Sequence, residues 1–328
     1  MKKRILLCLT IVMACLMFSS CGKSDLKVYI GTQNLVSPQT VARAEDWFSE
    51  QMNCNVEVVQ YEDGVEISKA MKSGQVDFGM IGSIPVAKFI SQGMECKVIC
   101  IQSIIGEIET LAVRSDSGIN TAADLKGKTI ATLYSSTAHY SLLKYLDVNG
   151  IDHKDVNIKH MMVADIEPAF KRGDIDGAFI WEPTLSAIME NGGKKLVSAK
   201  EMADLGYATF DLEVVRSNFA KEHPDIVKQY IECIDKAVKL YNDDPKKAGD
   251  SMTKVFKITA DDALKRVQSS KWLTAKEQSE SQWFSGGKMA DILYDSACFL
   301  EEQGDIDTLP DKQLFADAVD SSFVDSFR

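Results

Sequence analysis

Hydroxyl side chains stand at several points where a buried strand is expected to give way to a helix. Ser83 lies two residues before Pro85, and Ser136 and Thr137 open the helical pattern at 137–149. The first N–H groups of a helix have no partner within the helix, so amides and hydroxyls gathered there can bind an oxyanion without Lys or Arg. Any one of these residues could equally be a simple helix cap. Their coincidence at strand ends favours a binding role for Ser83 and for at least one of Ser136 and Thr137.

Other polar and aromatic residues could complete such a site. Asp211 lies in an apolar strand, where a surface carboxylate would be unusual, and it could pair with a cation. Trp181 ends a strand and could form an aromatic wall, although core packing is the more common role of such a residue. Glu109 is a second candidate carboxylate, Gln33 could donate its amide, and Tyr140 lies in the first turn of a helix directed at the same place.

An alternation of short apolar runs and amphipathic stretches must position these residues. The expected strands are 26–32, 55–61, 76–81, 96–103, 109–114, 128–134, 156–163, 177–181 and 211–216. The expected helices are 38–52, 64–73, 84–92, 137–149, 164–172, 183–191, 224–243, 245–254, 259–270, 275–279 and 285–302. This order predicts the α/β class, with two parallel-rich sheets covered by helices.

One pair of segments repeats a local pattern. The first copy comprises residues 72–77 and 80–85, and the second comprises residues 171–176 and 179–183. Each copy contains, in order, a helix end, a glycine cap, Asp, a short buried strand and Pro. A common turn used twice would explain the repeat. Two similar lobes, each offering the tip of an equivalent strand to one cleft, would explain it as well.

A second repeat relates 111–115 to 213–217. We interpret these segments as two strands that cross between lobes. Lobe 1 would then comprise 21–112 and 217–328, and lobe 2 would comprise 113–216. Two crossings make a hinge, and hinged lobes close on ligands.

The first 21 residues predict export. Three basic residues precede a short apolar run at 5–18, which is followed by Ser19, Ser20 and Cys21. This order is typical of a secretory signal at 1–20, and the apolar run is too short to remain as a membrane span. Cys21 resembles the lipidated Cys of bacterial lipoproteins, although Phe18 stands where that motif prefers Leu. An ordinary secreted protein with a chance Cys is the alternative. We expect a protein held on the extracytoplasmic face of the cell membrane by a lipid on Cys21.

Composition narrows the possible partners. Removal of the three basic residues at the N-terminus changes the formal net charge from −11 to −14, which argues against nucleic acid and against electrostatic binding to anionic lipid. The mature length of about 308 residues favours two lobes, and we expect a monomer. Cys96 and Cys100 would lie about 13 Å apart along a strand, too far for a disulfide. Because the sequence holds no CxxC or HExxH motif, we expect no metal and no cofactor.

Longer motifs resemble one known family. The segments 134–143 and 172–183 are similar to those of the taurine-binding proteins, which are type II periplasmic binding proteins of ABC importers. Shorter matches at 63–64, 82–85, 209–211 and 272–274 extend the resemblance over essentially the whole mature chain. The resemblance implies a two-lobed fold with a two-strand hinge, a small sulfonate ligand, an ABC permease as partner, and Asp211 at the position of the ligand amine.

One departure leaves the ligand open. Glu182 follows Trp181 where the family pattern has a small residue, and a carboxylate there would repel a sulfonate unless it points away. A longer alkanesulfonate, nitrate and a thiamine-precursor pyrimidine remain alternatives to taurine. Asp211 argues against a plain anion, because an unpaired buried carboxylate beside an anion is costly.

An enzyme is the remaining alternative of a different class. A pyrimidine-synthesising family on this fold uses a Lys that forms a Schiff base with pyridoxal phosphate, and the expected strand tips carry no Lys. No nucleophile elbow or phosphate-binding loop stands out either. We therefore predict a binding protein that delivers its ligand to a permease, and a sensory binding protein that reports to a receptor remains possible.

Overall fold

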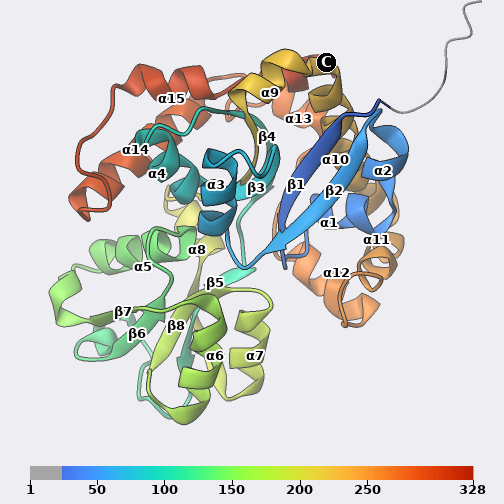
Figure 1. Ribbon diagram of the computed structural model, residues 1–328. Coiled ribbons are helices and arrows are strands. Elements are labelled where there is room, and N and C mark those ends of the chain that lie inside the picture. Colours follow the sequence, from blue (N-terminus) through green and yellow to red (C-terminus); the bar gives the residue numbers. More distant parts are fainter. Residues whose placement is uncertain (1–23, 328) are drawn as a thin grey trace, which may run out of the picture.

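The computed structural model describes residues 24–327, which form two five-stranded sheets covered by helices (Figure 1). The strands are β1 (Lys27–Gln33), β2 (Asn55–Tyr61), β3 (Phe78–Gly82), β4 (Cys96–Ile104), β5 (Glu109–Arg114), β6 (Thr129–Thr132), β7 (Asn157–His160), β8 (Gly177–Trp181), β9 (Gly193–Ser198) and β10 (Phe210–Arg216). The first sheet has the order β2-β1-β3-β10-β4, and the second has the order β7-β6-β8-β5-β9.

Most of the helices lie at the expected positions. In the first two thirds of the chain they are α1 (Pro38–Ala44), α2 (Trp47–Gln51), α3 (Gly64–Lys72), α4 (Ser83–Ser91), η1 (Ala122–Leu125), α5 (Thr137–Val148), η2 (His153–Asp155), α6 (Val163–Arg172), α7 (Thr184–Glu190), α8 (Ala199–Asp204) and α9 (Ser217–Glu222). The remainder are α10 (Pro224–Asp243), α11 (Pro245–Met252), α12 (Ala260–Gln268), α13 (Ala275–Glu280), α14 (Lys288–Glu302), α15 (Lys312–Ala318) and α16 (Ser322–Asp325).

The two sheets share one topology. In each sheet the first three strands are parallel, and the fourth strand runs antiparallel to both of its neighbours. The central strands β3 and β8 are the two copies of the first sequence repeat, and the antiparallel strands β10 and β5 are the two copies of the second. The fold class expected from the sequence is therefore confirmed, with one antiparallel strand inserted into each parallel-rich sheet.

The two strands of the second repeat, β5 and β10, do not connect the two sheets as expected. Neither β5 nor β10 crosses between the sheets, because each is hydrogen-bonded within one sheet on both sides. The chain changes sheet just before each strand, at residues 105–108 and 205–209. The expected boundary at residue 112 consequently falls inside β5. The two connections are joined to each other, since the amide of Ile105 donates to the carbonyl of Thr209 at 3.0 Å.

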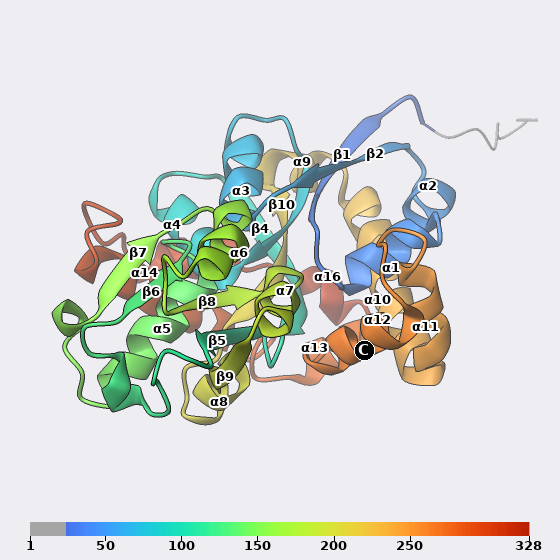
Figure 2. The same cartoon turned by 90° about the horizontal axis from the view of Figure 1, so that it is seen from below.

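An aromatic stack anchors the C-terminal helices to the first sheet. The ring of Tyr230 in α10 lies 4.3 Å from that of Phe78 in β3 and 5.2 Å from that of Phe48 in α2. All three side chains are buried, and each such burial stabilises the fold by roughly 1.5–3 kcal/mol. Figures 1 and 2 show α10 beside the first sheet, while α6 and α7 lie beside the second.

A few local features differ from expectation. The expected helix at 38–52 is two helices, because Asp46 adopts a left-handed conformation with φ of 57° between α1 and α2. The strand β9 and the helices α8, α9, α15 and α16 were not expected. Cys96 and Cys100 are buried thiols without a disulfide, as the strand spacing predicts. Within residues 24–327, no helix is long and apolar enough to cross a bilayer.

Candidate functional site

A small pocket lies where the two sheets meet. The ends of β1, β3 and β8 and the beginnings of β5 and β10 all reach it. Its lining residues are Gln33, Leu35, Asp63, Gly64, Val65, Gly82, Pro85, Ile105, Ile108, Glu109, Leu133, Ser136, Thr137, Trp181 and Asp211. Six of the eight residues that the sequence singled out for binding are in this set: Gln33, Glu109, Ser136, Thr137, Trp181 and Asp211.

Two carboxylates reach the pocket from equivalent positions in the two sheets. Glu109 in β5 pairs with Trp181, the last residue of the central strand β8. Asp211 in β10 pairs with Gly82, the last residue of the central strand β3. Both carboxylates stand five residues before the Arg of the repeated sequence, at Arg114 and Arg216. The repeat therefore places one acid on each side of the pocket.

Glu109 is almost completely buried, with 2% of its surface exposed. Its Oε2 atom accepts a hydrogen bond from the hydroxyl of Thr137 at 2.7 Å, and its buried Oε1 atom has no hydrogen-bond partner in the structure. Burial raises the pKa of Glu109 to about 8; the hydrogen bond from Thr137 opposes this increase, and the charge of Asp211 adds to it. An unpartnered carboxylate oxygen at a pocket wall can accept a hydrogen bond from a ligand.

Asp211 is buried to a similar extent, with 9% of its surface exposed. Its Oδ2 atom accepts a hydrogen bond from the hydroxyl of Ser103 at 2.8 Å. Burial raises the pKa of Asp211 to about 6, and the hydrogen bond from Ser103 opposes this increase. Asp211 is therefore the stronger acid of the two, and it carries the charge more readily at neutral pH.

Three helices begin at the pocket. Gly64 and Val65 open α3, Gly82 precedes α4, and Ser136 and Thr137 lie at the start of α5. The partial positive charge of these helix starts favours an anion between them. The Ser136 hydroxyl itself is occupied as a cap, because it accepts from the amide of His139 at 3.1 Å and donates to the carbonyl of Leu133 at 2.6 Å.

Asp63 is a third acid at the pocket and caps α3. Its Oδ1 atom accepts from the amides of Val65 and Glu66 at 2.8 and 3.0 Å. Burial raises its pKa, and these two hydrogen bonds oppose the increase. Asp63 thus has its own partners, unlike the Oε1 atom of Glu109.

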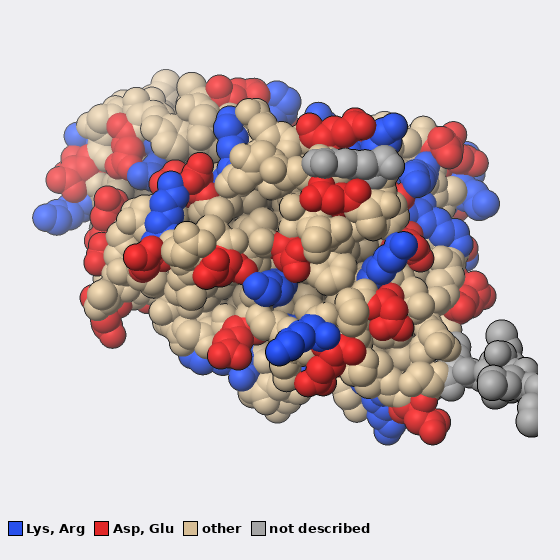
Figure 3. Space-filling view, turned by 90° about the horizontal axis from the view of Figure 1, so that it is seen from above, with Lys and Arg blue, Asp and Glu red and all other residues tan. Residues whose placement is uncertain are grey.

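Basic side chains do not offset these acids at the pocket wall. Among the described residues that line the pocket, three are acidic and none is Lys or Arg. By contrast, acidic and basic side chains are interspersed over the outer face in Figure 3. The pocket can therefore accept an anionic group only through amides and hydroxyls, and it presents carboxylates to any cationic group of the same ligand.

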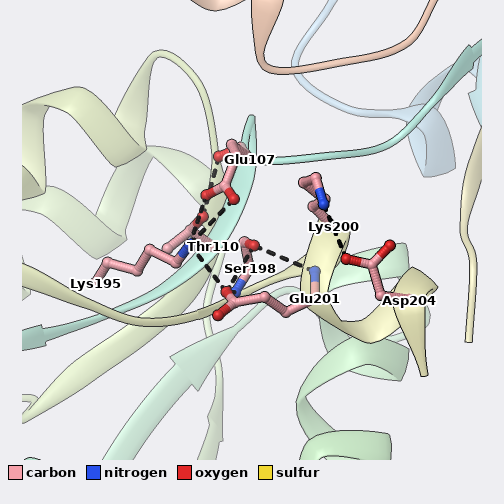
Figure 4. A network of polar contacts seen from close by, with 7 residues as sticks. All are labelled: Glu107, Thr110, Lys195, Ser198, Lys200, Glu201 and Asp204. Atoms are coloured by element: carbon pink, nitrogen blue, oxygen red, sulfur yellow. Dashed lines mark hydrogen bonds and ion pairs between the residues drawn. The ribbon is translucent and has the colours of Figure 1, made fainter.

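Residues that do not line the pocket hold the segment that precedes Glu109 in place. Lys195 in β9 forms ion pairs with Glu107 at 2.8 Å and with Glu201 in α8 at 2.9 Å (Figure 4). Thr110 donates to the carbonyl of Glu107 at 3.0 Å, and Glu201 accepts from the amide of Ser198 at 2.8 Å. This network holds the start of β5 against the edge strand of the second sheet.

Two of the residues expected to bind ligand do not line the pocket. The buried Ser83 hydroxyl lies 3.4 Å from the amide of Phe210 and accepts its hydrogen bond. Tyr140 packs edge-on against Phe299, with ring centroids 5.0 Å apart, and burial raises its pKa to about 12. Both side chains turn away from the pocket because α4 and α5 direct them into packing between elements.

Glu182 also points away from the pocket. Its Oε1 atom accepts from the hydroxyl of Ser186 at 2.8 Å, and its Oε2 atom lies 3.7 Å from Nε of Arg266. It lines a separate cavity together with Arg266. The repulsion expected between this carboxylate and a bound anion is thereby reduced.

Several lining residues carry no chemical signal in the sequence. Leu35, Ile105, Ile108 and Leu133 are ordinary apolar residues in connections that follow strands. Their place at the pocket depends on where the chain passes between the sheets, which residue type alone does not reveal. Asp63 could have been found from its position before Gly64, directly after a strand and at the start of a helix.

Comparison with known proteins gives the family. The taurine-binding periplasmic protein of Escherichia coli strain K12 is 32% identical over 301 residues, which cover 90% of this chain and 92% of that protein. A putative aliphatic sulfonates-binding protein of Bacillus subtilis strain 168 is 30% identical over 250 residues, covering 73% of this chain and 74% of that protein. The resemblance to taurine-binding proteins is thus confirmed.

The fold has a solved counterpart. The alkanesulfonate-binding protein SsuA from Xanthomonas axonopodis pv. citri, bound to MOPS, superposes with a TM-score of 0.74 at 22% identity, covering 91% of this chain and 99% of that one. These relatives are named as binding proteins, and this chain is likewise a solute-binding protein and not an enzyme. The profile of the NMT1/THI5-like family matches residues 34–248, and the chain belongs to that family.

Proposed function

We propose that this protein captures taurine or a closely related small aminosulfonate outside the cytoplasmic membrane and delivers it to an ABC permease. The observation that carries the proposal is the composition of the pocket, which combines three helix starts with buried carboxylates and has no Lys or Arg among its described lining residues. The names of the relatives support a sulfonate, and the carboxylates support a ligand that also carries an amine.

The sulfonate group would lie among the helix starts. A sulfonate has a permanent negative charge and three acceptor oxygens, so it needs several donors. The amides near Gly64, Gly82 and Thr137 begin three separate helices and converge on the pocket. Each hydrogen bond to a charged group contributes roughly 1.5–3 kcal/mol, so three or four such bonds suffice for micromolar affinity after the cost of association.

The ammonium group would lie between Glu109 and Asp211, with Trp181 as an aromatic wall. Glu109 offers its unpartnered Oε1 atom, and Asp211 uses only Oδ2 for Ser103. The indole of Trp181 is partly buried at the end of β8, where its face could stabilise a cation. Gln33 donates its amide to the carbonyl of Met80 at 3.0 Å and would contribute its remaining polar atoms.

We further propose that the two sheets are the cores of two lobes that close over the ligand. The first lobe would comprise the first sheet with the C-terminal helices, and the second lobe the second sheet with α5 to α8. Within residues 24–327, the chain changes sheet only at 105–108 and 205–209, so these two connections would serve as the hinge. Closure would remove water from the ligand and create the surface that the permease recognises.

The membrane location is part of the same proposal. Residues 1–20 and Cys21 lie outside the described residues, and the signal segment and lipid anchor rest on their sequence alone. A protein tethered by Cys21 would stay beside its permease. Mass spectrometry of the membrane fraction tests this point, and an unmodified Cys21 or a chain that starts elsewhere would contradict it.

A thermal-shift panel tests the ligand. Taurine, ethanesulfonate, β-alanine, nitrate and sulfate are each added to the mature protein. A ligand present at 100 times its dissociation constant stabilises the folded state by about 2.7 kcal/mol. We expect the largest shift with taurine, because ethanesulfonate lacks the amine and β-alanine lacks the sulfonate. A larger shift with ethanesulfonate or nitrate would indicate that the protein binds a plain anion and not an aminosulfonate.

A further inference from the structure

The two pocket carboxylates belong to different lobes. Glu109 is the first residue of β5, the antiparallel strand of the second sheet, and Asp211 is the second residue of β10, the antiparallel strand of the first. Both side chains line one pocket, and each is at least nine-tenths buried. In the closure proposed above, the two carboxylates approach each other only when the lobes come together and exclude water.

The surroundings do not neutralise this pair. Glu109 faces the hydroxyl of Thr137 from α5 and the indole of Trp181 from β8, and Asp211 faces the hydroxyl of Ser103 from β4. The other charged group at the pocket wall is Asp63, at the start of α3. Glu213, two residues beyond Asp211, adds a buried acid behind it. The titratable groups among the described residues that line the pocket are therefore all acids.

Closing the lobes on an anion thus brings three negative charges together. Two ionised carboxylates and a sulfonate in a small space without a cation would repel one another strongly, because water no longer screens them. A carboxylate can avoid this cost by binding a proton, and the uncompensated Oε1 atom of Glu109 is a suitable place for it. The ammonium group of an aminosulfonate would supply the same positive charge.

We propose that closure of the pocket takes up protons on the Glu109–Asp211 pair, and that an ammonium group on the ligand replaces one of these protons. This inference rests on the proposed function, since it concerns the same pocket. By this proposal, the Glu109–Asp211 pair determines the selectivity for aminosulfonates over plain sulfonates. An amine-free sulfonate enters the closed pocket only together with an additional proton.

The consequence is a difference in pH dependence between two ligands. A binding step that takes up one more proton weakens up to tenfold for each unit that the pH rises. An alkylammonium group stays protonated throughout the range from pH 6 to pH 8. The affinity for ethanesulfonate should therefore fall more steeply than the affinity for taurine over this range, and selectivity for taurine should increase with pH.

Isothermal titration calorimetry of the mature protein in detergent measures the effect directly. Titrations at one pH in two buffers with different ionisation enthalpies give the number of protons taken up per ligand bound. We expect the number for ethanesulfonate to exceed that for taurine by up to one. We expect the two numbers to become equal in the double variant Glu109→Gln/Asp211→Asn, with an affinity for ethanesulfonate that no longer depends on pH and exceeds that of the unmodified protein at pH 8.

The outcomes are distinguishable. Equal proton uptake for the two ligands in the unmodified protein overturns the inference, and this comparison does not depend on a variant that folds. If the unmodified protein binds ethanesulfonate too weakly to measure, the double variant must bind it, and failure to do so also overturns the inference. If taurine does not bind the unmodified protein at all, the proposed function itself is wrong.

Discussion

The Nε atom of Arg266 in α12 lies 3.7 Å from the Oε2 atom of Glu182, which follows β8. Glu182 extends the central strand of the second sheet, whereas α12 belongs to the C-terminal helices. The side chains are only 12% and 16% exposed for Glu182 and Arg266. This contact joins the two proposed lobes beside the ligand pocket, so it should form when they close.

The first prediction concerns this ion pair. Glu182→Gln and Arg266→Gln should each weaken taurine binding about 3- to 10-fold, because an ion pair of this kind contributes roughly 1 kcal/mol and would be lost from the closed form alone. A double-mutant cycle measured by calorimetry should show that the two effects are not additive. Lys265→Gln, at an exposed neighbour in α12, is the matched control and should change the affinity little. Additive effects would mean that the residues act independently.

The second prediction concerns the amine. Asp211→Asn keeps the shape of the side chain and removes its charge, so it should weaken taurine binding about 10- to 100-fold, because a hydrogen bond to a charged group contributes roughly 1.5–3 kcal/mol. Asp307→Asn makes the same chemical change at an exposed position and serves as the control. If calorimetry finds the same taurine affinity in Asp211→Asn as in the unmodified protein, Asp211 does not bind the ligand amine.

The third prediction concerns the aromatic wall. Because Trp181 lines the pocket, its fluorescence should change when taurine is added. Trp181→Phe should abolish most of this change and weaken binding, while the thermal unfolding of the ligand-free protein changes only slightly. Trp47→Phe removes an indole that packs under Lys236, 4.1 Å from its ring centroid, and should preserve the signal. A Trp181→Phe protein that no longer folds would assign this residue to the core instead.

The fourth prediction concerns a close approach between the two proposed lobes. A Cβ atom on Gly82 would lie 3.1 Å from Cγ2 of Thr137, which is tighter than most Cβ contacts, so the threonine would have to shift by a few tenths of an ångström. Gly82→Ala should therefore disfavour the closed form and weaken binding several-fold. Thr137→Ser removes the obstructing methyl group and keeps the hydroxyl that bonds Glu109. The double variant Gly82→Ala/Thr137→Ser should regain much of the lost affinity in calorimetry, and no recovery would contradict this steric explanation.

The fifth prediction concerns the stability of the first sheet. Glu213 is fully buried and accepts a hydrogen bond from Tyr230 at 2.7 Å, and burial raises its pKa to about 8. The folded protein therefore binds this proton more tightly than the unfolded chain, in which a Glu titrates near 4.3. The free energy of unfolding contributed by Glu213 should be highest below about pH 4 and fall as the pH rises towards 8. Glu213→Gln should reduce this fall in denaturant unfolding curves measured from pH 5 to pH 8. An unchanged slope would show that Glu213 does not titrate in this range.

The sequence predicted the elements well wherever a local pattern determines them. The helix α10 begins and ends at the expected residues, 224 and 243, because Pro224 opens it and its apolar face has a clear helical period. The strand β9 was missed, since Lys194 and Lys195 interrupt its apolar character at the edge of the sheet. An edge strand has one solvated side, so its sequence carries a weaker signal than that of a central strand.

Part of the site could be predicted because some of its residues carry a local signal in the sequence. Asp211 and Trp181 stand out as unusual residue types at strand ends, and both line the pocket. The position of Ser83 at the start of a helix favours a binding role, but a hydroxyl there can turn towards a neighbouring strand, and it contacts Phe210 instead. The direction of a side chain depends on packing between distant segments, and the sequence does not express it locally.

The hydrogen bond between Ile105 and Thr209 joins the two connections between the sheets. Two linkers joined in this way would move together, which would leave the two proposed lobes essentially one axis of rotation. An occupied and an empty receptor would then differ by a single angle, so that a membrane partner could distinguish them by touching only one patch on each lobe.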